Sequence, residues 1–180
     1  EKRVLKTKRT LIDVAEPDDA PLLLRYHTEN RDHLAPWEPL REVEYLTLDK
    51  QSSLINERRE AYAAGNAYHF VAFAPGRSEV LGLCNFTGVV RGPFQACYLG
   101  YSITKRHEGT GLMSEVLEAC LTYMFERVSL HRVMAAYMPR NTRSGRLLER
   151  LGFEREGYAR DYLKIAGRWE DHILTAKIAE

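Results

Sequence analysis

The sequence has few cysteines and no long hydrophobic stretch. The chain has three cysteines, Cys84, Cys97 and Cys120, and no CxxC pair. An odd number without such a pair is typical of reduced core residues and argues against a disulfide framework or a zinc site. The histidines show no metal-ligand spacing. No stretch approaches the ~18 apolar residues of a membrane span, and the polar residues 1–9 lack a signal sequence. We therefore expect a cytoplasmic protein with no membrane contact and no metal.

The sequence also has little excess charge of either sign. Its 26 Lys and Arg residues nearly balance its 25 Asp and Glu residues, for a net charge of +1. This balance gives no electrostatic reason to expect direct DNA binding. One basic cluster lies near the start, at Lys2, Arg3, Lys6, Lys8 and Arg9. We interpret it as a solvated N-terminal arm, with a contact to an acidic or RNA-rich partner as the alternative.

Length and composition indicate one domain. The chain has 180 residues, of which 44% are hydrophobic and 28% are charged, and this balance suits a single globular domain over residues 1–180. Nothing in the sequence indicates an oligomeric state.

Hydrophobic periodicity and turn residues predict an alternation of strands and helices. Strands are expected at 9–14, 68–74, 80–90, 96–103, 132–138, 158–165 and 170–178, and helices at 18–29, 48–64, 112–127 and 144–151. Residues 30–39 are expected to be irregular, Gly65 to end a helix, and Gly100 to mark a bulge. A strand–helix–strand unit inside an otherwise antiparallel order predicts an α/β mixed sheet with helices on both faces.

One glycine-rich segment joins a predicted strand to the strongest predicted helix. Lys105–Gly111 reads K-R-H-E-G-T-G. Gly109 and Gly111 allow a sharp turn that brings backbone N–H groups together, and the dipole of the following helix favours an anion there. Lys105 and Arg106 could add charge. The segment predicts a pyrophosphate cradle that needs no metal, with an ordinary strand-to-helix turn as the alternative.

Long stretches on both sides of this segment carry a family resemblance. They are ENRDHLAPWEP, NFTGVVRG, ACYLGYSI, GLM, YMPRNTRSG, LLERLGFEREGYARDYL and the W-x-D-H motif at 169–172, and together they extend over nearly the whole chain. They resemble the GNAT superfamily of N-acetyltransferases, and within it the RimJ-type ribosomal-protein-alanine N-acetyltransferases.

The resemblance implies both a fold and an activity. The fold would be a mostly antiparallel mixed sheet with a central splayed parallel strand pair and helices on both faces. The activity would be transfer of the acetyl group of acetyl-CoA to the N-terminal alanine of a ribosomal protein by direct attack in a ternary complex. Two alternatives stay open: a GNAT enzyme acting on another amine, and a weakly catalytic CoA- or ribosome-binding module.

The resemblance also implies which residues bind the cofactor. In the family, pantetheine lies between the two splayed strands, and an asparagine commonly contacts it. Asn141 matches that asparagine, but it could equally cap the next helix, and the two roles are compatible. The implied cofactor-binding residues are Tyr101, Ser102, Ile103, Arg106, His107, Glu108, Gly109, Thr110, Gly111, Leu112, Met113, Asn141 and Ser144. One arginine among Arg140, Arg143 and Arg146 could meet the 3′-phosphate of CoA, although a solvated helix face would also explain them.

The catalytic residues are less well defined. The commonest family pattern places a tyrosine seven residues after the asparagine to protonate the CoA thiolate, but this chain has Leu148 there. Ser144 is our first candidate donor and Tyr137 the second, although helix capping and strand packing would also explain them. The candidate bases are Glu29, Glu38, Asp161 and Asp171, and none stands out. The candidate substrate-lining aromatics are Trp37, Phe86, Tyr98, Tyr162 and Trp169, with packing in the core as the alternative.

Overall fold

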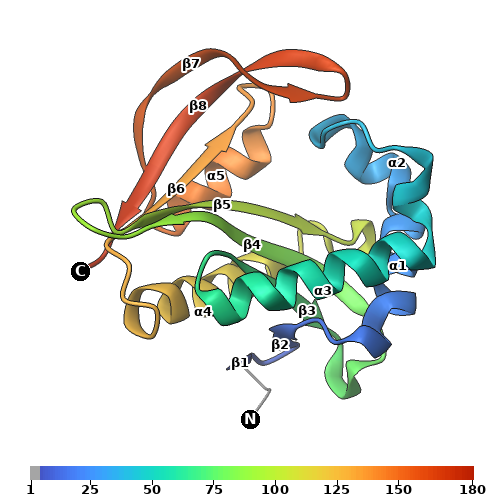
Figure 1. Ribbon diagram of the computed structural model, residues 1–180. Coiled ribbons are helices and arrows are strands. Elements are labelled where there is room, and N and C mark those ends of the chain that lie inside the picture. Colours follow the sequence, from blue (N-terminus) through green and yellow to red (C-terminus); the bar gives the residue numbers. More distant parts are fainter. Residues whose placement is uncertain (1–4) are drawn as a thin grey trace.

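The computed structural model describes residues 5–180, in which one mixed sheet runs through the molecule (Figure 1). Its strand order is β1-β2-β3-β4-β5-β6-β8-β7. The strands are β1 (Leu5–Lys6), β2 (Leu11–Val14), β3 (Tyr68–Phe73), β4 (Val80–Val90), β5 (Ala96–Ile103), β6 (Arg132–Tyr137), β7 (Glu154–Ile165) and β8 (Arg168–Ile178). β5 and β6 are parallel and the other neighbours are antiparallel. The expected mixed sheet is confirmed.

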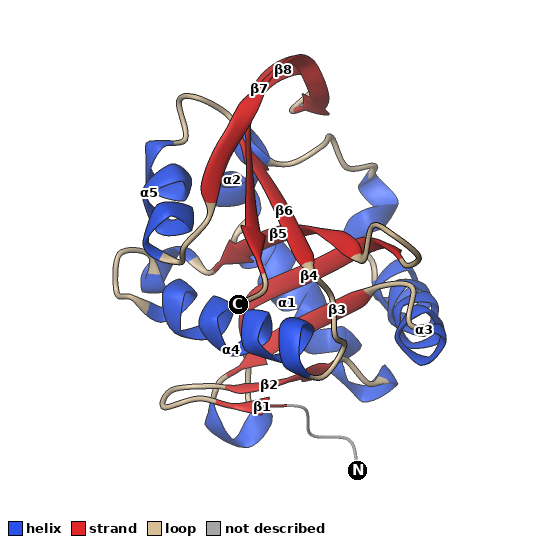
Figure 2. Cartoon of the chain, turned by 90° about the vertical axis from the view of Figure 1, so that its left-hand side faces the viewer, coloured by secondary structure: helices blue, strands red, loops and turns tan. Residues whose placement is uncertain are grey.

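Helices cover both faces of the sheet. The α-helices are α1 (Ala20–Glu29), α2 (Arg31–Leu34), α3 (Leu48–Ala64), α4 (Leu112–Glu126) and α5 (Thr142–Arg150). Short 3-10 turns are η1 (Pro17–Asp19), η2 (Ala35–Trp37), η3 (Val43–Leu46), η4 (Pro75–Arg77) and η5 (Lys105–His107). Figure 2 shows α3 and α4 on opposite sides of the strands. Within residues 5–180, no helix is both long and apolar enough to cross a bilayer.

Two cores result, because strand side chains alternate between the two faces. In β3, Phe70 packs with α4 and α5 in the larger core, whereas Val71 packs with α1 and α3 in the smaller one. We call these the α4 face and the α1 face of the sheet. Both β3 side chains are almost completely buried, so the central strands are apolar on both sides.

Most predicted boundaries are confirmed, and three predictions are wrong. Residues 30–39 are not irregular throughout, because α2 and η2 occupy most of them. Gly100 marks no bulge, since it pairs in register with Asn85. The irregularity lies on β4 between Thr87 and Val90, where Gly88 has a φ of +61° that suits glycine. β7 begins at Glu154, earlier than expected, because pairing with β8 continues to that residue.

A buried ion cluster fixes the start of α1. The Arg77 guanidinium, in the β3–β4 turn, donates to Asp13 at 2.9 Å and to Asp19 at 2.7 and 3.1 Å. Both carboxylates are about 95% buried. Asp19 also accepts the Glu16 N–H at 2.7 Å, so the cluster ties β2, the β3–β4 turn and the start of α1 together. Because Tyr26 of α1 is hydrogen-bonded to Ser102 of β5 at 2.8 Å, this anchoring reaches the site described next.

Candidate active site

The parallel strands β5 and β6 separate part-way along their length. They pair from Ala96 opposite Arg132 to Leu99 opposite Ala135 and no further. Beyond that point, residues 100–103 pair only with β4, and residues 136–137 pair only with β8. In the described part of the chain, the inner edge of β5 therefore has no strand partner beyond Leu99. The expected splayed pair is confirmed.

A cavity of about 910 Å³ occupies this gap and is lined by side chains from both faces of the sheet. On the α4 face, Tyr101 and Tyr137 line it and pack against the core formed with α4 and α5. On the α1 face, Tyr98 and Ser102 line it, and the Ser102 hydroxyl lies 2.8 Å from the phenol of Tyr26 in α1. The splay thus gives one continuous space with a different lining on each side of the sheet.

The glycine-rich turn forms one end of the cavity. Gly109 and Gly111 have φ values of +77° and +79°, which other residues adopt only with strain, and both line the cavity. Gly111 caps the N-terminus of α4. Asn30, at the end of α1, holds the turn through its side-chain oxygen, which accepts the Thr104 hydroxyl at 3.1 Å and the Lys105 N–H at 2.9 Å. This geometry supports the predicted anion cradle.

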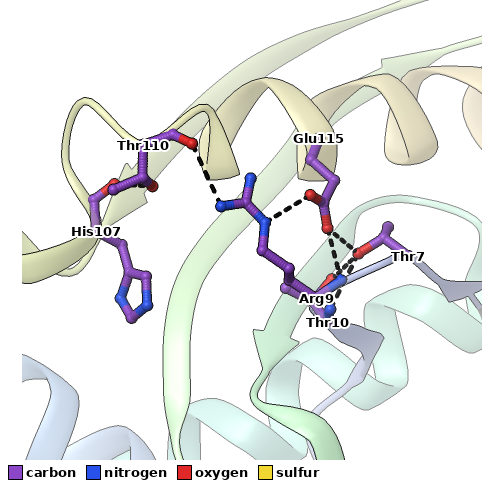
Figure 3. A network of polar contacts seen from close by, with 6 residues as sticks. All are labelled: Thr7, Arg9, Thr10, His107, Thr110 and Glu115. Atoms are coloured by element: carbon purple, nitrogen blue, oxygen red, sulfur yellow. Dashed lines mark hydrogen bonds and ion pairs between the residues drawn. The ribbon is translucent and has the colours of Figure 1, made fainter.

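The N-terminal segment holds the same turn from outside (Figure 3). Arg9 binds Glu115, in the first turn of α4, through Nε at 2.8 Å and its backbone N–H at 2.9 Å, and it donates to the Thr110 carbonyl at 3.3 Å. Thr7 donates to Glu115 at 2.6 Å. Burial raises the pKa of Glu115, but the hydrogen bonds from Thr7 and Arg9 together lower it by more, so its pKa lies below the usual value.

This network corrects the sequence interpretation of the basic cluster. Lys6 and Lys8 are exposed, as a solvated arm requires, but Arg9 is a structural ion-pair partner of α4. Lys2 and Arg3 lie outside the described residues.

Two charged side chains of the turn point in different directions. Glu108 pairs with Arg143 of α5 and lies 3.3 Å from His33 Nε2 of α2, so it connects both sides of the cavity. Arg106 does not line the cavity and instead pairs with Glu79. The prediction that the Arg106 side chain adds charge to the cradle is therefore wrong. Neither Thr110 nor Leu112 lines the cavity, and Leu112 is buried. Any contact of these two residues with the cofactor would therefore be made by their backbone groups.

The candidate proton donors cluster at the start of α5. Asn141 caps the helix by accepting the Ser144 N–H at 3.3 Å, so its capping role is confirmed, and it also lines the cavity. The Ser144 hydroxyl is hydrogen-bonded to the phenol of Tyr101, whose pKa burial raises to about 12. Tyr137 lines the cavity and packs against Gly145, where a Cβ would lie 2.8 Å from its ring.

Leu148, which stands where the usual family tyrosine would be, lies in the core. Its side chain is 1% exposed and belongs to the core beside α4. A phenol there would be buried among apolar groups, away from the cavity lining.

Aromatic side chains line the α1 face of the cavity. Trp37, Tyr98 and Tyr162 are among the lining residues, and burial together with the nearby Tyr98 raises the pKa of Tyr162. Phe86 is 0% exposed and packs against Phe70 at a ring separation of 6.1 Å. The prediction that Phe86 lines the substrate mouth is therefore wrong, because its side chain on β4 points into the core.

Of the four candidate carboxylates, Glu38 alone lines the cavity. Burial raises its pKa, and Arg41 opposes that shift. Glu29 forms an exposed pair with Arg25. Asp171 accepts the Tyr158 hydroxyl at 2.5 Å and the Asp161 N–H at 2.9 Å, within the β7–β8 hairpin.

Two histidines that line the cavity were not predicted as site residues. His172 of β8 lines the cavity, although the W-x-D-H motif that contains it had drawn attention only as part of the resemblance. His33 of α2 lines it as well. No sequence pattern indicated His33, because α2 is far from the glycine-rich turn in the sequence.

Comparison with known proteins identifies the family. A family model described as an acetyltransferase (GNAT) domain matches residues 9–154. The chain belongs to the GNAT acetyltransferase family. It is an N-acetyltransferase that uses acetyl-CoA, which agrees with the splayed strands and the glycine-rich turn described above.

Several members of the family are similar over nearly their whole length. The [ribosomal protein uS5]-alanine N-acetyltransferase of Escherichia coli (strain K12) is 47% identical over 172 residues, which cover 96% of this chain and 89% of that protein. The probable N-acetyltransferase YjcK of Bacillus subtilis (strain 168) is 36% identical, with 96% of each chain covered.

Solved structures agree in fold. The ribosomal-protein-S5-alanine acetyltransferase of Vibrio fischeri superposes with a TM-score of 0.94 at 35% identity, covering 98% of this chain and 96% of that one. Mycobacterium smegmatis RimJ in complex with CoA-disulfide gives a TM-score of 0.88 at 28% identity, covering 94% and 82%. The GNAT-like fold is thereby confirmed.

Proposed function

We propose that this chain transfers the acetyl group of acetyl-CoA to the N-terminal alanine of ribosomal protein uS5. The observation that carries the proposal is the 47% identity, over 96% of the chain, to an Escherichia coli enzyme with that activity in its name. The continuous cavity through the sheet supports it, because direct transfer needs the thioester and the amine to meet in one space.

The α4 face would receive the cofactor. We place the pyrophosphate against the backbone N–H groups of residues 106–111 at the start of α4, where a helix N-terminus favours an anion. Pantetheine would lie along the unpaired edge at Tyr101, Ser102 and Ile103, next to Asn141. His107 and Met113 also line the cavity there. We propose acetyl-CoA as the cosubstrate and no metal.

The α1 face would receive the amine, with Trp37, Tyr98 and Tyr162 around the acceptor. An α-amino group has a pKa near 8, so its deprotonation needs only modest assistance. Attack on the thioester carbonyl forms the amide and releases the CoA thiolate. We propose that Ser144, hydrogen-bonded to Tyr101, protonates the thiolate, with Tyr137 as the alternative donor.

Peptide acetylation tests the acceptor. The enzyme is incubated with acetyl-CoA and matched peptides that begin with Ala, Ser or Lys, together with spermidine, and CoA release is followed. We expect the fastest release with the Ala peptide. Equal turnover of all acceptors, or turnover of spermidine alone, would contradict the proposal and favour another amine. Tight CoA binding with no turnover of any amine would favour a weakly catalytic CoA-binding protein.

Two substitutions test the donor. Ser144→Ala should lower kcat while acetyl-CoA binding stays close to wild type, and Tyr137→Phe serves as the matched removal of the other hydroxyl. If only Tyr137→Phe lowers kcat, the donor role passes to Tyr137.

A further inference from the structure

His172 lies on the acceptor side of the sheet. In β8, Leu174 pairs with Ala136 of β6, and His172, two residues earlier, has the same orientation as Leu174. Ala136 in turn lies on the face of Tyr98, because Tyr98 pairs with Met134. The His172 side chain thus lines the cavity from the α1 face, although it is only 4% exposed.

The position of one hydrogen bond fixes the tautomer of this imidazole. Nδ1 lies 2.9 Å from the backbone carbonyl oxygen of Glu170. A carbonyl can only accept, so Nδ1 carries the proton and the neutral ring has its lone pair on Nε2. Nε2 has no hydrogen-bond partner within residues 5–180 and is not an enclosed atom. A lone pair is therefore presented to the cavity.

The two carboxylates next to His172 in the sequence bind other side chains. The Glu170 carboxylate binds Arg140 at 3.0 Å, and the Asp171 carboxylate binds Tyr158 within its own hairpin. The nearest ring is that of Tyr162, whose centroid is 5.5 Å from that of His172.

Other titratable side chains line the same cavity, among them Glu38, Tyr98 and His33. Glu38 and Tyr98 line it on the acceptor side, and His33 lines it while contacting Glu108. Unlike Glu38, His172 combines an orienting hydrogen bond with an unpartnered nitrogen, the usual arrangement of a general base.

We propose that His172 is the general base that takes a proton from the acceptor ammonium group, directly or through one water. The inference rests on the proposed function of the acceptor side. Nε2 accepts one N–H proton and becomes an imidazolium whose Nδ1–H still donates to Glu170. The neutral amine attacks the thioester carbonyl carbon, the C–N bond forms and the C–S bond breaks. The Ser144 hydroxyl protonates the departing sulfur and is reprotonated by the second amine proton, and His172 returns its own proton to solvent.

The test measures the pH dependence of kcat/KM for wild type and His172→Gln with the Ala peptide. Without a base, an α-amine with a pKa near 8 is only about one-tenth neutral at pH 7, so we expect roughly a tenfold loss of kcat/KM at that pH. The loss should shrink toward pH 9.5, because an α-amine with a pKa near 8 is then neutral without a base. CoA affinity and the melting temperature should stay near wild type.

His69→Gln is the matched control. His69 is also on the α1 face, but it is hydrogen-bonded to Asn85 at 3.0 Å and does not line the cavity, so its variant should keep the wild-type pH profile. If His172→Gln does not fold, His172→Gly with added imidazole replaces it, and imidazole should restore the rate.

Each outcome bears on one proposal. A kcat/KM within about threefold of wild type at pH 7, or a loss of equal size at every pH, overturns the role of His172 as base. Absence of any wild-type turnover of the Ala peptide overturns the proposed acceptor instead, and the two failures are therefore distinguishable.

Discussion

Replacing Gly109 by alanine tests the cradle directly. Gly109 has a φ of +77°, and a Cβ built there meets no protein atom within 4 Å. Because Gly109 lines the cavity, the methyl group would project into the space assigned to the pyrophosphate. A left-handed conformation costs an L-residue about 1–2 kcal/mol, which predicts a fall in melting temperature of roughly 2–4 °C per kcal/mol for a chain of this size.

The loss in cofactor affinity can be estimated separately. A hydrogen bond to a charged group is worth about 1.5–3 kcal/mol, and each 1.4 kcal/mol is about tenfold in a dissociation constant. Losing one N–H contact to the pyrophosphate should therefore weaken CoA binding about 10- to 150-fold. Titration calorimetry of Gly109→Ala with CoA measures this change.

Gly76 provides a matched control. It has a φ of +80°, also with nothing within 4 Å of the built Cβ, but it lies in the β3–β4 turn outside the cavity lining. Gly76→Ala should lower the melting temperature by a similar amount and leave CoA affinity unchanged. If Gly109→Ala binds CoA within twofold of wild type, the pyrophosphate does not lie where we place it.

Three further predictions concern charge. Glu108→Gln removes a negative charge from the cradle and frees Arg143, so CoA should bind about 2- to 10-fold more tightly in calorimetry, as expected for about 0.4–1.4 kcal/mol; weaker binding would contradict the assignment. Arg77→Met leaves Asp13 and Asp19 buried without their partner, and urea unfolding should show a loss of about 3–5 kcal/mol. Burial, and secondarily Arg58, lowers the pKa of His27 from 6.5 to about 4. The unfolded chain therefore binds this proton first, and up to about 3 kcal/mol of stability, present above pH 6.5, should be lost as the pH falls to 4; His27→Gln should flatten that dependence.

The sequence predicted elements well where the local pattern and the tertiary environment agree. The helix ending at Gly65 was placed correctly, because Thr47 caps its start and Gly65, with a φ of +73°, ends it. The segment 30–39 was misjudged because its prolines suggested loop, although a proline is tolerated in the first turn of a helix, as Pro36 is in η2.

Site residues were likewise predictable where their role depends on local structure, and not where it depends on tertiary contacts. Gly109 and Gly111 were recognisable because their role depends on local backbone geometry. Phe86 was misplaced because the alternation of an 11-residue strand does not by itself say which face meets the core. His172 was missed because its meaning depends on a hydrogen bond to Glu170 and on strand pairing with β6, neither of which spacing reveals.

The early end of β5–β6 pairing divides the sheet into two antiparallel halves that share only four residue pairs. If pantetheine lies along the open edge of β5, as proposed, the cofactor supplies the contacts that a continued strand would have made. Acetyl-CoA then acts as a part of the folded structure as well as a reactant. A ligand bound only by the native state raises stability by about 2.7 kcal/mol at 100 times its dissociation constant, so the resistance of this protein to unfolding would rise with the supply of acetyl-CoA.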